Sequence, residues 1–393
     1  MIENAGQYDW NNASNIVIMK KGENMTDPRI KKLAQVMVHY SLAIKPGQKV
    51  YLQSTPMAHE FNLAFYEEAI KAGAHVTFAI DGAYYPGAQE IFLKYASQKQ
   101  LEFVSPVRKL MIETYDARMV VEAETNTREL AGIDPKRISL WRKANAPMFQ
   151  KMLKRIESGA LKWCLTVYPT EAMAQEANMS LNDYSEFVYE AGMLNAKDPV
   201  ALWKAEKTKQ QKLVNWLKGK NQVMLNGDNI DLSFSIKGRK FIPCAGDQNF
   251  PDGEVFTSPV ENSVNGWVRF KYPAIFDGQE IEDIELWFEN GKVVQEKAQR
   301  NQELLTAQLN TDKGARILGE WGIGTNYNIK KFTKNMLFDE KLGGTIHLAM
   351  GLGFEEAGGH NTSGLHWDML CDMAKSEIVI DGKLFYKNGK PVI

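Results

Sequence analysis

The sequence has few of the features that mark secreted, membrane-spanning or nucleic-acid-binding proteins. Its 393 residues include three cysteines, which form no CxxC pair and cannot all pair with one another. A reduced, cytoplasmic protein is therefore expected. No apolar run approaches the roughly 20 residues that a membrane-spanning helix needs. The formal net charge of −1 gives no electrostatic reason to expect a nucleic-acid or membrane-surface partner.

A glycine-rich phosphate loop is also missing from the place where a nucleotide-binding fold would need it. Residues 50–52 are expected to form a strand, 59–72 a helix and 75–80 the next strand. This order favours parallel strands joined by a crossover. The turn after the first strand is Gln53-Ser54-Thr55-Pro56. Because it contains no glycine, the hypothesis of a nucleotide-dependent enzyme has little support.

The pattern of apolar residues divides the chain near residue 219. Residues 1–24 are polar and are expected to be an extension. Residues 25–218 are predicted to form an α/β domain with a parallel sheet, with further strands at 119–123, 138–140 and 163–167. Residues 219–393 are predicted to form a β-rich half of the chain, because residues 230–236 alternate apolar and polar. Hairpin-type turns recur in this half, at Asn290-Gly291, Asp381-Gly382 and Asn388-Gly389.

Three of the six histidines lie between Thr345 and Cys371. His347 follows a short strand-like step. His366 is separated from Asp368 by one residue, so an extended chain would point both side chains to one face. An imidazole and a carboxylate side by side offer a nitrogen and an oxygen to a divalent cation. The alternative is a pair of polar strand residues, or a core histidine satisfied by its neighbour.

Two carboxylates occupy unusual settings in the same half of the chain. Glu254 opens a short strand directly after a Pro-Asp-Gly turn, which is expected to hold its carboxylate at a rim. Glu320 lies between apolar residues and glycines, where it is expected to be buried and to need a metal or a base as partner. The alternatives are a solvated turn residue for Glu254 and a salt-bridged core acid for Glu320.

Taken together, these side chains offer two nitrogen and three oxygen donors. The set is too large for one tetrahedral zinc ion, but it suits two divalent ions that share a carboxylate. Two ions ~3.5–4 Å apart can activate one water molecule and polarise a carbonyl group. One of them can also hold the free α-amino group of a peptide. The pattern therefore predicts a two-metal centre formed by Glu254, Glu320, His347, His366 and Asp368.

Five short motifs occur in order along the chain: KLA…HYSL…KPG (32–47), GEVFTSP (253–259), GE (319–320), GTIHLA (344–349) and HWDM (366–369). With these motifs the chain resembles the thermophilic-type metallo-aminopeptidases, the M29 peptidase family, over nearly everything from Lys32 onward. The resemblance implies an α/β domain with a parallel sheet, followed over residues 219–393 by a mixed, β-rich α+β metal-binding catalytic domain. It further implies peptide substrates with a free N-terminus, and a homodimer. It also implies that the five donors bind two divalent ions per chain, zinc or cobalt with magnesium or manganese as alternatives. Glu320 and Glu254 would be the catalytic carboxylates.

One position departs from the family pattern. Where M29 peptidases usually have a tyrosine seven residues after the first ligand histidine, this chain has Phe354, which has no hydroxyl to stabilise a developing oxyanion. Three outcomes are open: slower turnover, a substitute donor, or metal binding without peptidase activity. The second hypothesis for function is therefore a catalytically impaired metal- or peptide-binding homologue. The candidate substitute donors are Tyr272, Tyr327 and His360, of which His360 could also line the substrate entrance. The histidines interpreted as structural are His39, His59 and His75.

Overall fold

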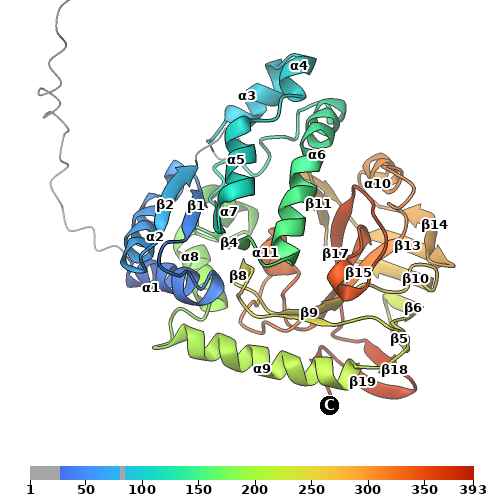
Figure 1. Cartoon of the computed structure of the whole chain (residues 1–393). Helices are drawn as coiled ribbons and strands as arrows, with labels where there is room; N and C mark the ends of the chain where they lie inside the picture. Colours follow the sequence, from blue (N-terminus) through green and yellow to red (C-terminus); the bar gives the residue numbers. More distant parts are fainter. Residues whose placement is uncertain (1–26, 80–84) are drawn as a thin grey trace, which may run out of the picture.

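The computed structural model describes residues 27–79 and 85–393, so the predicted polar extension, residues 1–24, lies outside the described part of the chain. Figure 1 shows an α/β part beside a β-rich part, with helix α9 (Pro199–Leu217) running beneath both. Within the described ranges, no helix is long and apolar enough to cross a membrane.

Parallel strands form the sheet of the α/β part, as the sequence predicts. In sheet order they are β2 (His75–Ala79), β1 (Lys49–Gln53), β3 (Ala117–Glu122) and β4 (Lys162–Val167). The short strand β8 (Asn249–Phe250), from the second half of the sequence, pairs with β4 at the edge. The helices around this sheet are α1 (Pro28–Val36, continued by a π-helical turn, Met37–Ser41), α2 (His59–Lys71), α3 (Ala88–Tyr95), α4 (Gln98–Leu101), α5 (Pro106–Thr114), α6 (Pro135–Glu157), α7 (Glu171–Glu176) and α8 (Leu181–Ala191).

The strand predicted at residues 138–140 is wrong, because this segment lies inside helix α6. Asp134 caps that helix by accepting a hydrogen bond from the backbone N–H of Lys136, and a proline occupies the first turn. Its buried residues, Ile138, Met148 and Met152, recur at helical spacing. A short apolar run does not distinguish a strand from one turn of a half-buried helix, and here the cap decides between them.

The β-rich part contains two large sheets. The eight-stranded antiparallel sheet has the order β14-β13-β10-β6-β5-β18-β19-β20, and the five-stranded sheet has the order β17-β16-β15-β9-β7. The three predicted hairpin turns are confirmed, since Asn290-Gly291, Asp381-Gly382 and Asn388-Gly389 connect successive strands with both residues at positive φ. The elements of this part are β5 (Gln222–Gly227), β6 (Ile230–Ser235), β7 (Ile242–Cys244), β9 (Glu254–Thr257), β10 (Asn265–Phe270), β11 (Ala274–Phe276), β12 (Gln279–Ile281), β13 (Ile284–Glu289), β14 (Lys292–Lys297), α10 (Gln302–Leu309), β15 (Leu318–Gly324), α11 (Met336–Asp339), β16 (Thr345–Gly351), β17 (His366–Asp372), β18 (Glu377–Ile380), β19 (Lys383–Lys387) and β20 (Lys390–Pro391).

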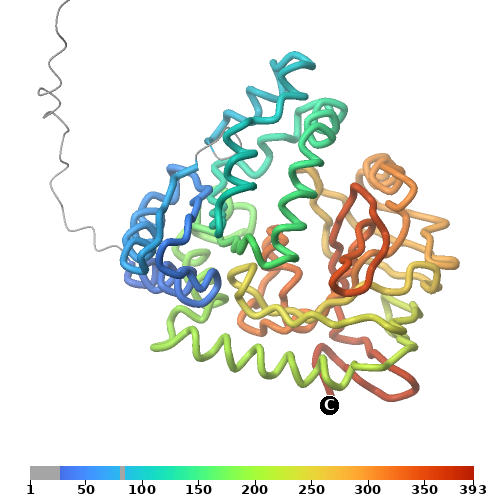
Figure 2. Tube along the Cα trace, viewed as in Figure 1, coloured from blue at the N-terminus to red at the C-terminus, as the bar shows by residue number. Residues whose placement is uncertain are grey.

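Two hydrophobic cores meet along the junction of the two parts. The core of the α/β part includes Phe250 and Phe338 from the second half of the sequence, so the chain crosses between the parts more than once. Helix α9 contributes Trp203 to this core and Leu217 to the core of the β-rich part. Figure 2 shows this helix along the lower side of both parts. Helix α9 therefore packs against both cores and connects the two parts. The domain boundary near residue 219 stays a prediction.

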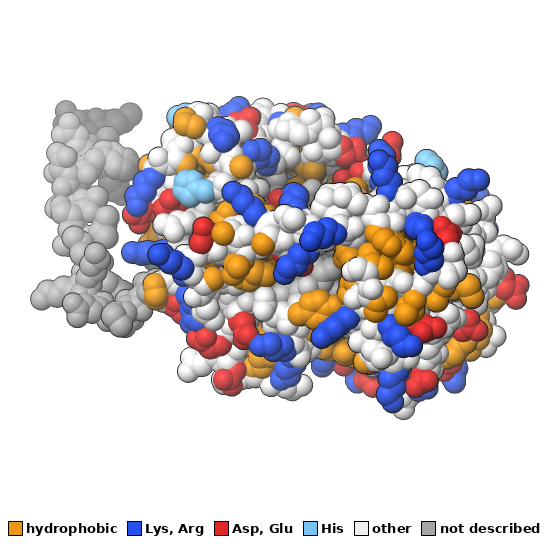
Figure 3. Space-filling view, turned by 90° about the horizontal axis from the view of Figure 1, so that it is seen from below, with side chains coloured by type: hydrophobic (Ala, Val, Ile, Leu, Met, Phe, Trp, Pro, Cys, Tyr) orange, Lys and Arg blue, Asp and Glu red, His pale blue; other side chains and the backbone are white. Residues whose placement is uncertain are grey.

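The face that contains α9 carries both signs of charge. In Figure 3 this face is seen from below, with lysine and arginine side chains spread among acidic ones and with apolar side chains gathered toward the β-rich part. Such a mixed distribution agrees with the formal net charge of −1. It does not form the one-signed stripe that is typical of a nucleic-acid-binding face.

Candidate metal centre

Four neighbouring strands of the five-stranded sheet bring the five predicted donors together. Glu254 begins β9, Glu320 lies on β15, His347 on β16, and His366 and Asp368 on β17. These strands follow one another in the sheet order, so residues as far apart in sequence as Glu254 and His347 come into contact. We refer to these five side chains as the acid–histidine cluster.

A glycine makes room for His347 within the sheet. Gly322 on β15 lies directly opposite His347 on β16, and a Cβ atom at residue 322 would lie 2.0 Å from the imidazole ring. Any side chain at residue 322 would therefore displace the ring. Glycine at residue 322 is therefore required to make space for the His347 ring.

Glu320 occupies the centre of the cluster. Its Oε1 lies 3.3 Å from Nε2 of His347 and its Oε2 lies 3.3 Å from Nε2 of His366. Nε2 of His347 also lies 3.2 Å from Oε2 of Glu254, and Nε2 of His366 lies 3.4 Å from Oδ2 of Asp368. The five residues thus form two groups of three, and within each group the donor atoms lie within 4.8 Å of one another. Glu320 belongs to both groups.

Backbone carbonyls fix the orientation of the two imidazoles. Nδ1 of His347 lies 3.0 Å from the carbonyl oxygen of Glu340, and Nδ1 of His366 lies 3.3 Å from that of Leu352. Since a carbonyl oxygen only accepts, each Nδ1 carries a proton, and each Nε2 faces the carboxylates. This is the arrangement in which a histidine presents Nε2 to a metal ion while its other nitrogen is held by a second partner.

The cluster is buried except on one side. Glu254, Glu320, His347 and Asp368 are each at most 9% exposed, whereas the His366 side chain is 28% exposed. The prediction of a buried Glu320 is confirmed. The prediction that Glu254 lies at a rim is wrong, because the residue is 5% exposed and its carboxylate pairs with the fully buried Lys341. His366 and Asp368 share a face of β17, as predicted from their spacing.

The charges of the cluster depend strongly on one another. Burial would raise the pKa of Glu320, but hydrogen bonds from His347 and His366 outweigh it and lower the pKa to about 2. Burial would likewise lower the pKa of His347, but its bond to Glu320 raises the value to about 10. Burial raises the pKa of Asp368 to about 6. Burial also raises the pKa of Glu254 to about 8, although Lys341 and His347 act against it. The histidines therefore stabilise the charged form of Glu320, whereas burial favours the protonated forms of Glu254 and Asp368.

Lys341, which the sequence analysis did not identify, contacts the cluster through Glu254. Its Nζ lies 2.7 Å from Oε1 of Glu254 and also pairs with Glu340, and its side chain is 0% exposed. Residues 339–341 read Asp-Glu-Lys, a charged run that is typical of a solvated turn, so no signal in the sequence indicated burial. Lys341 occupies one oxygen of Glu254 and leaves Oε2 directed toward His347.

Two buried oxygens in the cluster have no hydrogen-bond partner among the described residues. They are Oε2 of Glu254 and Oδ1 of Asp368. Buried acceptors of this kind are costly, and in native proteins each calls for an explanation such as a bound ion. Each group of three donors contains one of these unpaired oxygens. This pattern is expected if each group binds a cation.

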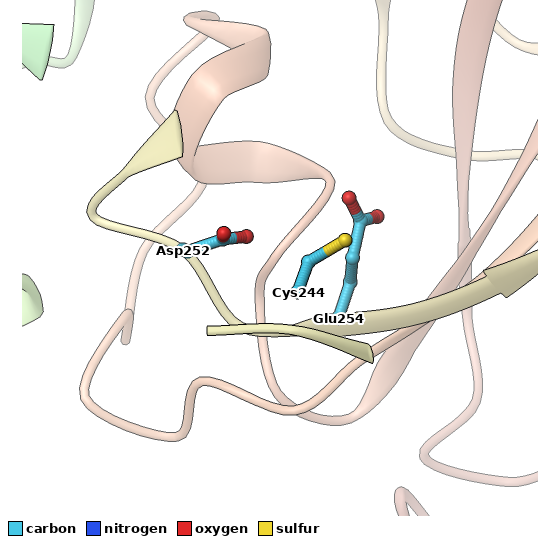
Figure 4. Close-up of side chains that lie close together, drawn as sticks. All are labelled: Cys244, Asp252 and Glu254. Atoms are coloured by element: carbon cyan, nitrogen blue, oxygen red, sulfur yellow. The ribbon is translucent and has the colours of Figure 1, made fainter. Parts of the chain in front are cut away.

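A third grouping adjoins the cluster through Glu254. Cys244, Asp252 and Glu254 have donor atoms within 4.8 Å of one another, and Figure 4 shows the sulfur of Cys244 beside the Glu254 carboxylate. Both oxygens of Asp252 accept hydrogen bonds from backbone amides, of Gly246 and Gly253. The Lys341 ammonium also bonds to Glu254. These acids already have donors, so the acid–histidine cluster is the stronger candidate for a metal ion.

Phe354, which stands where the family usually has a tyrosine, lies at the open side of the cluster. The ring of Phe354 is 5.0 Å from that of His366, so this residue does border the site. The three candidate substitute donors make no hydrogen bond, ion pair or ring contact with the cluster within the described chain. The Tyr327 hydroxyl donates to the carbonyl of Gly389, the Tyr272 ring packs on Phe332, and the backbone of His360 donates to Glu261.

A family profile, curated proteins and a solved structure each match most of the chain. The sequence profile described as thermophilic metalloprotease (M29) matches residues 26–391. Aminopeptidase 2 of Geobacillus stearothermophilus is 26% identical and the match covers 84% of each chain. Aminopeptidase T of Thermus thermophilus is 25% identical, with 92% of this chain and 95% of the relative covered. The solved structure of wild-type AmpT from Thermus thermophilus matches with a TM-score of 0.82 at 23% identity, covering 93% of this chain and 99% of the other, and so has the same fold.

Proposed function

The chain belongs to the thermophilic metalloprotease (M29) family, and from that premise we propose that it is a metal-dependent aminopeptidase that releases amino acids from the N-terminus of peptides. Relatives that match more than four fifths of the chain carry the name aminopeptidase. The observation that carries the proposal is the acid–histidine cluster, in which two groups of three donors share Glu320.

The donor set fits two divalent ions. Glu254 and His347 would hold one ion, His366 and Asp368 the other, and Glu320 would bridge them, since each of its oxygens faces a different histidine. The orphaned oxygens of Glu254 and Asp368 support this division. Mixed nitrogen and oxygen donors suit zinc or cobalt, with manganese or magnesium as alternatives. When bound, two such ions would supply Lewis acidity, polarising a peptide carbonyl and lowering the pKa of a water molecule.

The protein's own groups orient the reactants and move the proton. One of the cluster's carboxylates, with Glu320 and Glu254 as the candidates, would accept a proton from an attacking water and pass it to the departing amine. Glu254, held at Oε1 by Lys341, keeps its second oxygen in the cluster. Because the cluster is open mainly on the side of His366, a peptide reaches it from that side.

The second candidate function rests on Phe354. This ring packs against His366 and Phe256 and can offer no hydrogen bond to an oxyanion. Loss of one such donor costs about 2.7–4 kcal/mol of transition-state stabilisation. A homologue that binds metal and peptide with impaired turnover is therefore the alternative.

The assembly and location of the protein are part of the proposal. We infer a cytoplasmic homodimer acting on peptides with a free N-terminus, in line with the family resemblance. Sedimentation of the purified protein tests the dimer.

Hydrolysis of leucyl-anilide, before and after removal and return of metal, tests the proposed activity. The expected result is release of the aniline that is lost with a chelator and restored by cobalt or zinc. N-acetyl-leucyl-anilide is the matched control, because it has no free amino group and should resist cleavage. Equal cleavage of both compounds would contradict an aminopeptidase, and binding of metal without cleavage of either would favour the impaired homologue.

A further inference from the structure

A separate cavity of about 440 Å³ lies between the α/β part and the β-rich part. Glu122, at the end of β3, and Leu165, on β4, contribute to its wall, so it opens at the carboxyl ends of parallel strands. In open α/β sheets this edge is where ligands bind, and the volume falls within the range of small-molecule sites. Asp339 and Glu340, at the end of α11, close it from the other side. We call it the acidic cavity.

The acids of this cavity outnumber its available bases. Arg128 and Lys334 line it, but both are engaged with the carboxylates of Glu176 and Glu280. Glu340 is paired with Lys341. No ion pair involves the remaining three acids of the wall within the described chain. These are Glu122, Glu124 and Asp339.

Two buried polar groups of the wall also have no partner among the described residues. They are Oδ2 of Asp339 and the hydroxyl of Tyr184, on residues that are each 1% exposed. The other oxygen of Asp339 accepts hydrogen bonds from the backbone and the hydroxyl of Thr333, so the side chain is fixed with Oδ2 left over. Unpaired groups this deeply buried are costly, and a ligand with donor hydrogens would satisfy them.

The spacing of the acids and the apolar part of the wall favour an organic cation over a metal ion. Glu122, Glu124 and Asp339 are not among the groups of three described residues whose donor atoms lie within 4.8 Å of one another. The wall includes apolar side chains, among them Leu165, Met173 and Phe332. Such a surface suits the methylene stem of a long basic chain, whose head would reach the acids.

From these contacts we propose that the acidic cavity binds an aliphatic ammonium or guanidinium group. The group belongs either to a basic side chain of a peptide substrate or to a free amine. The first source rests on the proposed aminopeptidase function, and the second does not. Glu340 links the two sites, because it lines the cavity and its carbonyl oxygen bonds to His347 of the acid–histidine cluster.

The protonation of the acids agrees with this assignment. Burial raises the pKa of Glu122 to about 7 and that of Asp339 to about 8. Both carboxyls therefore give up a proton only reluctantly while no cation faces them. A bound guanidinium would supply the missing counter-charge and the missing hydrogens at once.

Calorimetric titration with agmatine tests the proposal directly. The probe has a guanidinium, a methylene stem and no carboxylate, and the titration uses chelator-treated protein so that the metal centre does not compete. We expect saturable binding that Glu122→Gln and Asp339→Asn each weaken by about 10- to 100-fold, the cost of a hydrogen bond to a charged group. Tyr184→Phe should weaken it less. Glu303→Gln removes an exposed acid on α10 and should leave it unchanged.

Matched peptides distinguish the two sources. Peptides with arginine at the first, second or third position are compared with the same peptides containing citrulline, which is similar in shape but uncharged. If the cation belongs to the substrate, the arginine form has the lower KM at one position and Asp339→Asn abolishes the difference. If it is a free amine, agmatine binds without any such preference. The proposal would be overturned if the folded wild-type protein neither bound agmatine nor preferred arginine peptides. If it bound agmatine but did not hydrolyse leucyl-anilide, only the proposed aminopeptidase function would be overturned.

Discussion

The acid–histidine cluster and the acidic cavity each bring several carboxyl groups together, and Glu340 contacts both. In the cluster, each acid has a basic neighbour: Glu320 lies between two histidines and Glu254 is bonded to Lys341. In the cavity, Asp339 has no basic partner within the described chain. The pKa of Glu320 is accordingly lowered to about 2, while burial raises that of Asp339 to about 8.

The comparison teaches that burial alone does not set the charge of an acid. Both side chains are less than 5% exposed, so their loss of hydration is similar. The difference comes from the neighbours, since an adjacent cationic group favours the ionised form and its absence favours the protonated one. A carboxylate held ionised between two imidazoles suits a metal ion, whereas a proton-holding site suits a ligand that brings its own positive charge.

The largest expected effect follows from Glu320→Gln. The substitution keeps the shape of the side chain but removes the charge that both groups of three donors share. We expect leucyl-anilide turnover to fall by at least about 1,000-fold with the fold retained, as for other residues that act as part of one catalytic unit. Near-normal turnover with full metal occupancy would show that the site is elsewhere. Glu303→Gln, on the surface, is the matched control.

Lys341→Met should reduce stability and metal binding together. Removing a fully buried ammonium leaves the carboxylates of Glu254 and Glu340 without their partner. Breaking a buried pair in this way typically costs about 3–5 kcal/mol. Denaturant unfolding measures the loss, and competition with a chromogenic chelator measures metal affinity. Lys297→Met, which removes an exposed partner of Glu285, should change neither appreciably.

Phe354→Tyr should raise turnover by about tenfold or more if the missing hydroxyl limits catalysis. The ring already lies beside His366, so the added hydroxyl extends from a position at the open side of the cluster. The measurement is kcat for leucyl-anilide with saturating metal. An unchanged or lower kcat would mean that another group already stabilises the oxyanion.

The smallest expected effect is a change in the pH dependence of stability in Asp339→Asn. Because the pKa of Asp339 rises from its ordinary value of 3.8 to about 8 on folding, the folded chain holds this proton more tightly than the unfolded chain. That stabilisation is complete below pH 3.8 and is lost as the pH rises through 8. The variant should therefore match the wild type near pH 4 and exceed it by about 1–3 kcal/mol above pH 8.

Thermal unfolding at both pH values measures this difference. The asparagine keeps the oxygen that accepts from Thr333, so the local fold is retained. A variant less stable than the wild type at high pH would contradict the assignment of Asp339 as a protonated acid.

Much of the fold could be predicted from local patterns. The alternation over residues 230–236 and the three hairpin dipeptides specify strands and turns through short-range backbone preferences, and all of them occur as predicted. The strand predicted at 138–140 is wrong because two apolar residues, Ile138 and Leu140, carry too little periodicity to outweigh a helix cap at Asp134. The pairing of β8 with β4 depends on contacts across 80 residues, which no local pattern records.

The site was predictable where chemistry and spacing coincide. His366 and Asp368 lie two apart on a strand, so their shared face follows from backbone geometry. Glu254 was expected at a rim, because the turn before it looks solvated, yet it is buried. Lys341 and the acidic cavity were missed entirely. Their residues come from segments far apart in sequence, and each segment taken alone resembles an ordinary charged surface.

Metal stoichiometry tests the central claim most directly. Elemental analysis after loading with zinc, cobalt or manganese, followed by gel filtration, counts the ions per chain. The account predicts about two ions for the wild type, about one for His347→Ala or His366→Ala, and none tightly held in Glu320→Gln, because that carboxylate belongs to both groups of donors. A wild-type protein that takes up no ion under any loading condition, or a Glu320→Gln variant that retains both, would contradict it.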